Sequence, residues 1–251
     1  MKLAVISDVH ANAFALEAVL ADITKRSVTT LVNLGDIFYG PIAPRKTYDL
    51  LMDFEEDVVT ICGNQDRQIY EATVAEIAAN PTMAMVIEAL HGEPMEWMCS
   101  LPPELQINND VYLCHGAPGN DLSYLLEDIH SGHPVIRADE EIQHLLQGQD
   151  ASLILCGHSH LPKIVTLGSG QLIVNPGSVG LPAYADDLPV PHSIENYSSH
   201  ASYAVVEKTD DGWLVEHCSV PYDVAAAVRL CHGLRRSDWA GFITSGRAGS
   251  L

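Results

Sequence analysis

Basic residues are scarce in this chain, which has 13 Lys and Arg against 33 Asp and Glu and a formal net charge of −20. Proteins that bind nucleic acid without sequence preference replace phosphate counterions with clustered Lys and Arg side chains. We therefore expect no long nucleic acid as a partner. The many carboxylates are typical of a solvated acidic surface, which favours solubility but does not identify a reaction.

Other features are also missing. The six cysteines form no C-x-x-C pair, and a chain of 251 residues with 47% apolar residues can bury a core without disulfide bonds. No segment approaches the roughly 18 consecutive apolar residues of a membrane span, and the opening MKLAVIS is too short for a signal peptide. We expect free thiols, no membrane partner, a cytoplasmic protein and a single domain over residues 1–251.

Short apolar runs rich in β-branched residues recur through the first two thirds of the chain. They are typical of buried strands, and they lie at 3–6, 30–34, 58–62, 111–114 and 153–156. The segment NAFALEAVLADITKR between the first two runs has the spacing of an amphipathic helix, with its first Asn as an N-cap. This alternation of strands and helices predicts a layered α/β fold.

The pattern changes to hairpins after residue 160. Residues 163–175 and 202–219 each contain two alternating runs around a turn, which predicts a second, antiparallel sheet, and residues 222–236 are typical of a closing amphipathic helix. Two stretches, at about 119–135 and 181–201, fit neither a strand nor a packed helix. Long loops in a compact domain are often functional, so we expect these two to flank a site.

Each of the five apolar runs is followed by polar residues that are able to bind a metal ion. These residues are Asp8 and His10, Asp36, Asn64, His115, and His158 and His160. Ligands of open α/β sheets gather at the carboxyl ends of strands, so five such ends in succession predict one site. Asp, Asn and His together suit Mn, Fe or Zn. Seven side chains are too many for one small ion that also binds substrate, which predicts two ions sharing a carboxylate.

The chain resembles the calcineurin-like metallophosphoesterase superfamily, and most closely its small bacterial and archaeal branch. The motifs that carry the resemblance are DVH at 8–10, GD at 35–36, GNQD at 63–66, CHG at 114–116, GHSH at 157–160 and NPGSVG at 175–180. As a fold, the resemblance implies an α/β/β/α sandwich, in which two facing mixed β-sheets are flanked by helices.

The resemblance also implies how the ligands divide between two divalent transition-metal ions. One ion would be held by Asp8, His10, Asp36 and His160, and the other by Asp36, Asn64, His115 and His158. Asp36 would be the bridge, and Asp36, Asn64 and His115 the catalytic residues. Two such ions beside two carboxylates carry a charge of about +2, which a bridging hydroxide lowers to about +1 and which suits a phosphoryl group. We expect that hydroxide to hydrolyse a small phosphodiester or phosphomonoester, such as a nucleotide.

The sequence departs from the superfamily pattern at two places. Many members have a His directly after the Asn ligand, regarded as helping to protonate the leaving oxygen, where this chain has Gln65. An amide cannot act as a general acid, although it can hydrogen-bond to a phosphate oxygen or simply fill space. Many relatives also have a basic residue shortly after GSVG, but LPAYADD follows here, so a phosphate-binding Arg is missing at that point.

Several further residues are weaker candidates for the site. Tyr39 and Tyr184 are aromatic candidates for contact with a base or sugar, with packing as the alternative role. Asp66 is expected to orient a metal ligand rather than to bind metal. Histidines of the two loops are candidate proton donors, with solvent-exposed loop residues as the alternative reading: His130, His133, His192 and His200.

Two other functions remain open at this stage. A retromer subunit has this fold without catalytic capacity, so a catalytically weak scaffold is the main alternative. The complete ligand set favours an enzyme, because a scaffold has no need to keep all seven side chains. A metal-storage or metal-sensing protein is a poorer match, since one buried two-metal site is a small store. Monoester and diester substrates, the metal pair and the oligomeric state stay open.

Overall fold

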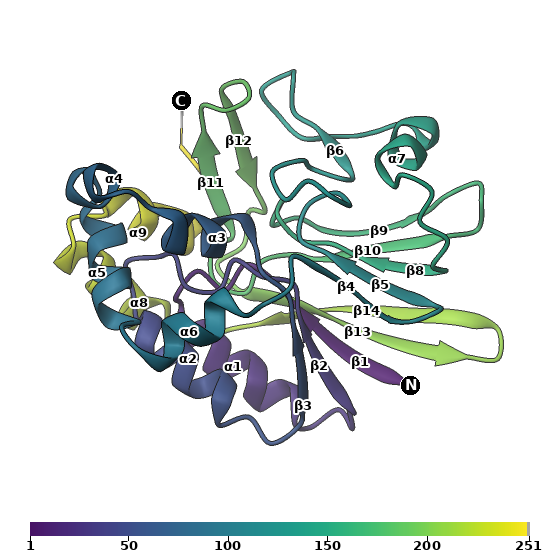
Figure 1. The fold of residues 1–251 in the computed structure, drawn as a ribbon, viewed down its shortest axis with the longest axis horizontal. Coiled ribbons are helices and arrows are strands. Elements are labelled where there is room, and N and C mark those ends of the chain that lie inside the picture. The colour runs from purple at the N-terminus through teal and green to yellow at the C-terminus, as the bar shows by residue number, and fades with distance from the viewer. Residues whose placement is uncertain (250–251) are drawn as a thin grey trace.

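Two five-stranded mixed sheets face each other at the centre of the protein (Figure 1). The computed structural model describes residues 1–249. The first sheet comprises β1 (Lys2–Ile6), β2 (Thr30–Asn33), β3 (Asp57–Thr60), β13 (Ala201–Thr209) and β14 (Gly212–Val220). The second comprises β4 (Glu104–Asn108), β5 (Val111–Cys114), β8 (Leu153–Leu155), β9 (Pro162–Thr166) and β10 (Leu172–Pro176). The predicted class of two facing mixed sheets is therefore confirmed.

The strand orders are β14-β13-β1-β2-β3 and β4-β5-β8-β10-β9. Within them, β1, β2 and β3 run parallel, as do β5, β8 and β10. The predicted hairpins are present, but they do not build a separate antiparallel sheet, and that expectation was wrong. Strands β13 and β14 extend the first sheet, whereas β9 extends the second. Alternation reveals a hairpin but not which open sheet edge supplies its hydrogen-bond partners.

Side-chain alternation in β1 explains the layers. Leu3 and Val5 lie in the core between the sheets, where they join Leu113 and Leu155 of the second sheet. Ala4 and Ile6 face the other way, into the core beneath the helices. Because a strand points successive side chains to opposite faces, a fully apolar strand is buried on both sides.

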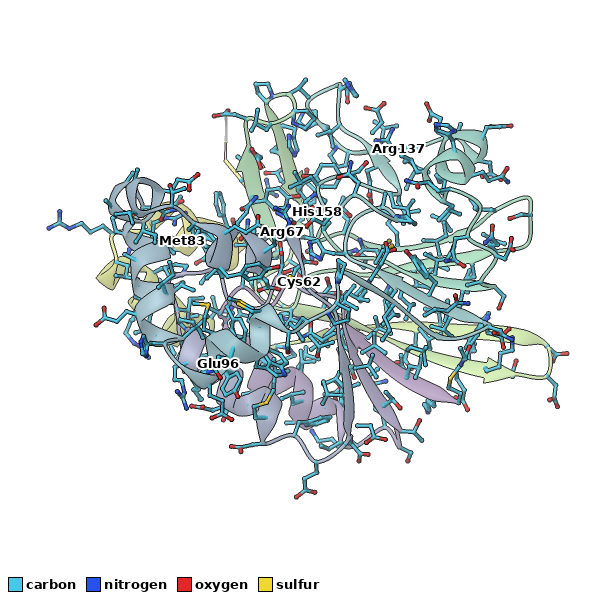
Figure 2. The ribbon with its side chains drawn as sticks, in the orientation of Figure 1. Cys62, Arg67, Met83, Glu96, Arg137 and His158 are labelled. Atoms are coloured by element: carbon cyan, nitrogen blue, oxygen red, sulfur yellow. The ribbon has the colours of Figure 1, made fainter. Side chains whose placement is uncertain are left out.

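Helices cover both outer faces (Figure 1). Side chains of α1, α2, α5 and α6 pack on the first sheet, and Met83 of α5, labelled in Figure 2, is one of them. Helix α7 packs on the second sheet. The helices are α1 (Ala13–Ile23), α2 (Pro44–Met52), α3 (Asn64–Glu71), α4 (Val74–Ala79), α5 (Pro81–Ala89), α6 (Glu93–Cys99), α7 (Asp139–Leu145), α8 (Val224–Gly233) and α9 (Ser237–Ser245). Within the described residues, none of them has the length and apolar character needed to cross a bilayer.

The two expected loops are partly ordered as short hairpins. The loop at 119–135 contains β6 (Glu127–Asp128), which pairs with β7 (Val135–Ile136). The loop at 181–201 contains β11 (Ala183–Asp186) and β12 (His192–Glu195), which pair with each other. The helix expected at 222–236 is α8, whereas α9 was not predicted. The two loops and the C-terminal segment are thus more ordered than the sequence pattern predicts.

Candidate metal centre

The seven predicted ligands lie just beyond the carboxyl ends of parallel strands, six of them in loops and Asn64 as the first residue of α3. They follow β1 (Asp8, His10), β2 (Asp36), β3 (Asn64), β5 (His115) and β8 (His158, His160). Six of them form two groups in which the ligand atoms lie within 4.8 Å of one another: Asp8, His10 and His160 in one, Asp36, His115 and His158 in the other. Asn64 lines the same cavity as both groups. The fold therefore brings together all the predicted ligands.

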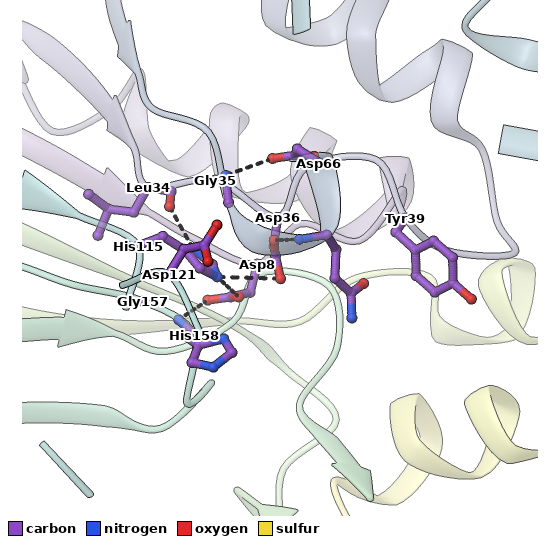
Figure 3. A network of polar contacts seen from close by, with 12 residues as sticks. Asp8, Leu34, Gly35, Asp36, Tyr39, Asp66, His115, Asp121, Gly157 and His158 are labelled. Atoms are coloured by element: carbon purple, nitrogen blue, oxygen red, sulfur yellow. Dashed lines mark hydrogen bonds and ion pairs between the residues drawn. The ribbon is translucent and has the colours of Figure 1, made fainter. Parts of the chain in front are cut away.

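The two groups adjoin through His115. Its Nε2 atom lies 3.4 Å from Asp36 Oδ2 and 3.9 Å from Asp8 Oδ1, and Figure 3 shows its ring between these carboxylates and the Leu34 carbonyl. Each carboxylate is held by one oxygen only. The backbone N–H of His158 donates to Asp8 Oδ2 (3.2 Å), and that of Gln65 donates to Asp36 Oδ1 (2.8 Å). The other oxygen of each carboxylate is directed toward the histidines.

Five of the seven candidate ligands have an unusual backbone conformation. Asp8, His10, Asp36, His158 and His160 all have φ between 49° and 67°, the left-handed region that residues other than glycine seldom adopt. Such conformations persist only where the surrounding structure imposes them, and they cluster at functional sites. The sharp turns point the side chains back over the strand ends.

Glycines allow the ligand loops to approach closely. A Cβ atom at Gly63 would overlap the backbone N and the carboxylate of Asp36, and one at Gly35 would overlap the backbone of Gly63. The G-D and G-N pairs of the sequence are thus explained by close backbone approach between the loops that carry Asp36 and Asn64.

Three of the ligand histidines have a defined tautomer. The Nδ1–H of His10 donates to the Tyr39 carbonyl (3.1 Å), that of His115 to the Leu34 carbonyl (2.8 Å), and that of His160 to the Leu181 carbonyl. In the neutral ring, Nε2 is then an unprotonated acceptor. The Nε2 atoms of His10 and His160 are 3.1 Å apart, so two lone pairs face each other. A cation between them would turn this repulsion into coordination.

Buried acceptors without partners show that the residues fit divalent metal ions. Among the described residues, Asp8 Oδ1, Asn64 Oδ1 and His115 Nε2 are buried and accept no hydrogen bond. A buried polar atom without a partner is costly, and metal-ligand bonds satisfy such lone pairs. Oxygen and imidazole ligands without thiolates suit borderline transition metals.

The pKa values of the candidate ligands also fit the binding of metal ions. Burial alone raises the pKa of Asp8 and of Asp36, but the nearby histidines outweigh it and lower both. Burial and the neighbouring histidines lower the pKa of His10 and of His158 to about 4. Burial also lowers the pKa of His115, yet Asp36 and then Asp8 raise it to about 10. Charged carboxylates and neutral imidazoles are the metal-binding forms, and of these five residues only His115 has to lose a proton to a cation.

Comparison with known proteins agrees with this geometry. The family model for the calcineurin-like phosphoesterase superfamily domain matches residues 1–196. The chain belongs to this superfamily.

Individual relatives cover nearly the whole chain. An uncharacterized protein of Methanocaldococcus jannaschii is 27% identical over 95% of each chain. The crystal structure of a metallophosphoesterase from Sphaerobacter thermophilus is 26% identical, covers 98% of this chain and 100% of that one, and has a TM-score of 0.74. The zinc complex of Vps29 from Entamoeba histolytica is 15% identical, covers 87% and 99%, and has a TM-score of 0.45. The structure of this superfamily member thus resembles a metallophosphoesterase along its full length.

Asp66 of this phosphoesterase-superfamily chain binds backbone rather than a ligand side chain. Its Oδ1 accepts from the N–H groups of Ile37 (2.9 Å) and Phe38 (3.3 Å), and its Oδ2 accepts from that of Gly63 (3.1 Å). Burial, followed by the charge of Asp36, raises the pKa of Asp66 to about 7. Asp66 therefore holds together the two loops that carry Asp36 and Asn64, which is an orienting role.

The predicted substrate contacts fall at different places. Gln65 and Tyr184 line a cavity of about 220 Å³ beside the metal ligands, and Gln65 Oε1 is buried without a partner. Tyr39 is not among the described residues that line this cavity. Its hydroxyl accepts from Asn80 (2.9 Å), and its ring lies apart from the carboxylates in Figure 3. In the structure Tyr39 contributes its carbonyl to His10 and its ring to packing.

None of the four candidate proton donors is among the described residues that line this cavity. His130 is bound to Asp128 at the surface, and His200 to Ser219. His133 lines a separate pocket. His192 is buried and is bound to the Tyr124 hydroxyl (2.9 Å). A loop position in the sequence does not reveal toward which side a hairpin turns its side chains.

Tyr124 was missed by the sequence reasoning. Its ring stacks on His158 with the centroids 4.5 Å apart, while the ring of Tyr184 lies edge-on to His160 at 4.6 Å. The two hydroxyls are hydrogen-bonded at 2.7 Å, and the Tyr184 hydroxyl also donates to the His158 carbonyl. The two tyrosines therefore pack against the GHSH ligands from the cavity side. An aromatic in a loop carries no sequence signal for such a contact.

Glu127 is a second residue that was not anticipated. It is 2% exposed, and its Oε1 accepts from the hydroxyl of Ser159, which lies between His158 and His160. Burial raises the pKa of Glu127 to about 7, although Ser159, Lys163 and Arg137 lower it in part. Figure 2 labels Arg137 on this side of the protein. Glu127 is thus a buried acid that takes up a proton near neutral pH.

We expect the free energy of unfolding of Glu127→Gln, relative to that of the wild type, to increase as the pH rises. Because the pKa of Glu127 is raised in the fold, from 4.5 to about 7, its stability contribution is present below the unfolded-state pKa and lost as the pH rises through 7. At about 1.4 kcal/mol per pKa unit the loss is about 3 kcal/mol, which the neutral amide avoids. Urea unfolding of the wild type and the variant at pH 5 and pH 8 measures this difference.

The matched control is Glu88→Gln, at an exposed position on α5. It should leave the pH dependence of unfolding as in the wild type. Parallel pH profiles for Glu127→Gln and the wild type would show that Glu127 stays charged in the folded protein, and would contradict the prediction.

Proposed function

We propose that the protein is a phosphoester hydrolase that uses two divalent transition-metal ions held by the two ligand groups. The observation that carries this proposal is the pair of adjoining groups whose free lone pairs converge, above all the two Nε2 atoms of His10 and His160 at 3.1 Å. Membership of the phosphoesterase superfamily supports the reaction class. The proposed substrate is a small phosphodiester or phosphomonoester.

The residues around the cavity have separate tasks in such a reaction. Two bound divalent ions would supply Lewis acidity toward a phosphoryl oxygen and an activated water. Asp36, with one oxygen held by the Gln65 N–H, presents the other to His115, which also lies near Asp8, and it would be the carboxylate that both ions share. Asn64 adds a neutral oxygen, which completes the ligand set without lowering the positive charge. In this proposal the Gln65 amide hydrogen-bonds to a phosphate oxygen, which is a binding rather than an acid–base role.

The scaffold alternative makes different demands on these residues. A protein that only binds partners gains nothing from five ligands in the left-handed conformation or from buried acceptors without partners, and both features reduce stability. Because such costs persist where they serve function, the geometry favours the hydrolase.

Metal content and turnover test the proposal together. Elemental analysis of protein purified without chelator should find close to two transition-metal ions per chain, because each group offers three converging ligand atoms. The Mn-loaded protein should hydrolyse members of a panel of 4-nitrophenyl phosphomonoesters and phosphodiesters, and removal of the ions should abolish this. Stoichiometric metal without turnover of any ester would favour the scaffold, and a metal-free protein would refute both ion sites.

A further inference from the structure

The C-terminal segment reaches the metal centre although it lies outside the family match, which ends at residue 196. Arg236, Asp238, Trp239 and Phe242 line the cavity of about 220 Å³ that His10 and the other ligands line. Helix α9, which carries three of them, packs against β11 (Figure 1). One wall of the cavity is therefore built by residues that are not part of the common phosphoesterase domain.

This wall is fixed in place. Trp239 is 4% exposed and lies edge-on to His10, with the ring centroids 5.8 Å apart. The end of α9 is tied to the hairpin at 181–201, because the Tyr197 N–H donates to the Gly246 carbonyl (2.9 Å) and the Ala248 N–H donates to Glu195 (2.8 Å). A pre-ordered wall loses little entropy when a ligand binds, which is the property of a binding site.

Arg236 is the one Lys or Arg among the described residues that line the cavity. Its Nη1 donates to the Thr82 hydroxyl (2.9 Å), and its Nε and Nη2 donate to Asp238 (2.9 Å and 2.6 Å). The guanidinium also lies over the Trp239 ring at 5.3 Å. A guanidinium has five N–H donors, so these contacts leave donors for a ligand while its position is held on three sides.

The charges of the cavity beyond the metal ligands limit the substrate. Asp186 and Asp238 outnumber Arg236 there, so this part of the lining carries a net negative charge. The positive charge of two ions is concentrated at the other end and suits one phosphoryl group. A second phosphate would meet the carboxylates and be repelled. The remainder of the substrate is therefore uncharged.

The shape and apolar lining point to a planar group. Trp239, Phe242 and Tyr184 contribute aromatic rings to the cavity, and Phe242 and Tyr184 are only partly buried. The volume of about 220 Å³ is below the roughly 300–1,000 Å³ of typical small-molecule sites, so it fits one compact ring system beside a phosphoryl group. Aromatic faces beside the N–H groups that Arg236 leaves free are the complement of a nucleobase, which combines a flat ring with carbonyl acceptors.

We propose that residues 236–242 bind the organic part of the substrate, that this part is an uncharged nucleoside-type group, and that Arg236 is a substrate-binding residue for it. The proposal rests on the phosphoesterase function proposed above and specifies its substrate class as nucleoside esters with a single phosphate. Arg236 supplies the cavity with a cation, which the loop after GSVG does not. In this proposal, however, Arg236 binds the nucleoside rather than the phosphate.

Three esters with the same leaving group test separately whether the site prefers a nucleoside and whether it rejects a second phosphate. Methyl 4-nitrophenyl phosphate and thymidine 5′-(4-nitrophenyl phosphate) both carry one charge, and only the second has a base. The 3′-phosphorylated form of the thymidine ester adds a second phosphate. With the Mn-loaded wild type, kcat/KM should be highest for the thymidine ester and lower for the other two.

Arg236→Gln should raise KM for the thymidine ester by about 10- to 100-fold, the range for a lost hydrogen bond to a charged donor, and leave kcat within about twofold. Hydrolysis of the methyl ester should be affected far less than that of the thymidine ester, because the methyl ester does not reach the wall. Arg235→Gln is the matched control, since Arg235 is exposed and is not part of the lining. Calorimetric titration should show weaker binding of thymidine 5′-phosphate to Arg236→Gln, with unchanged binding of inorganic phosphate.

The outcomes distinguish this proposal from the one on which it rests. If the wild type hydrolyses none of the three esters, the proposed function fails. If it hydrolyses the methyl and thymidine esters equally well, or if Arg236→Gln changes both esters alike, the hydrolase stands and the nucleoside site is refuted. A preference for the 3′-phosphorylated ester would overturn the charge argument.

Discussion

Asp36→Asn should lower kcat by about 10³-fold or more and reduce the bound metal from about two ions per chain. Asp36 Oδ2 lies 3.4 Å from His115 Nε2, and Oδ1 is held by the Gln65 N–H, so this carboxylate stands where the two groups adjoin. The amide keeps the shape but removes the charge that both ions would share, and metal ions contribute several kcal/mol of transition-state stabilisation. Elemental analysis and steady-state kinetics on the same sample measure both effects.

Asp8→Asn provides the comparison within the site. Asp8 Oδ1 lies 3.2 Å from His160 Nε2, inside the other group, so this change should weaken mainly one ion. Asp49→Asn, on the exposed face of α2, is the surface control and should behave as the wild type. Retention of both ions by Asp36→Asn at wild-type affinity would show that Asp36 does not bridge.

Gln65→His should raise the turnover of alkyl phosphoesters by up to about 10²–10⁴-fold, the usual range for general acid catalysis. The Gln65 backbone is fixed at the start of α3 by its bond to Asp36, and its side chain lines the cavity. An imidazole at this position could therefore protonate a leaving oxygen, which the amide cannot. Aryl esters should change little, because their leaving groups depart without a proton.

The measurement is a plot of log kcat against the leaving-group pKa for both proteins. The native protein should give a steep slope and Gln65→His a shallow one. Gln68→His adds the same ring at an exposed position of the same helix, and it should keep the steep slope. A shallow slope in the native protein would mean that another residue already donates the proton, and the interpretation of Gln65 would be wrong.

The candidate ligands could be identified from the chain alone because each buried strand and the candidate that follows it are adjacent in the sequence. An apolar run predicts a buried strand, and the residues directly after the run must lie at the end of that strand. Asp8 has this position after β1, and His115 has it after β5. Parallel pairing then places these ends at one edge. The superfamily was identified from the motifs at these strand ends, and the two facing mixed sheets were implied by that resemblance, whereas the local patterns alone predicted a separate antiparallel sheet.

The cavity around the ligands was decided by tertiary structure. Arg236 and Trp239 are more than 220 positions from His10 in the sequence, and they reach it only because α9 packs against β11 and α8 packs against α1. Glu127 and Tyr124 lie in a loop whose side-chain directions depend on the pairing of β6 with β7. Local periodicity fixes which residues end a strand, whereas long-range packing, driven by burial of apolar surface without directional preference, selects the residues that meet across the site.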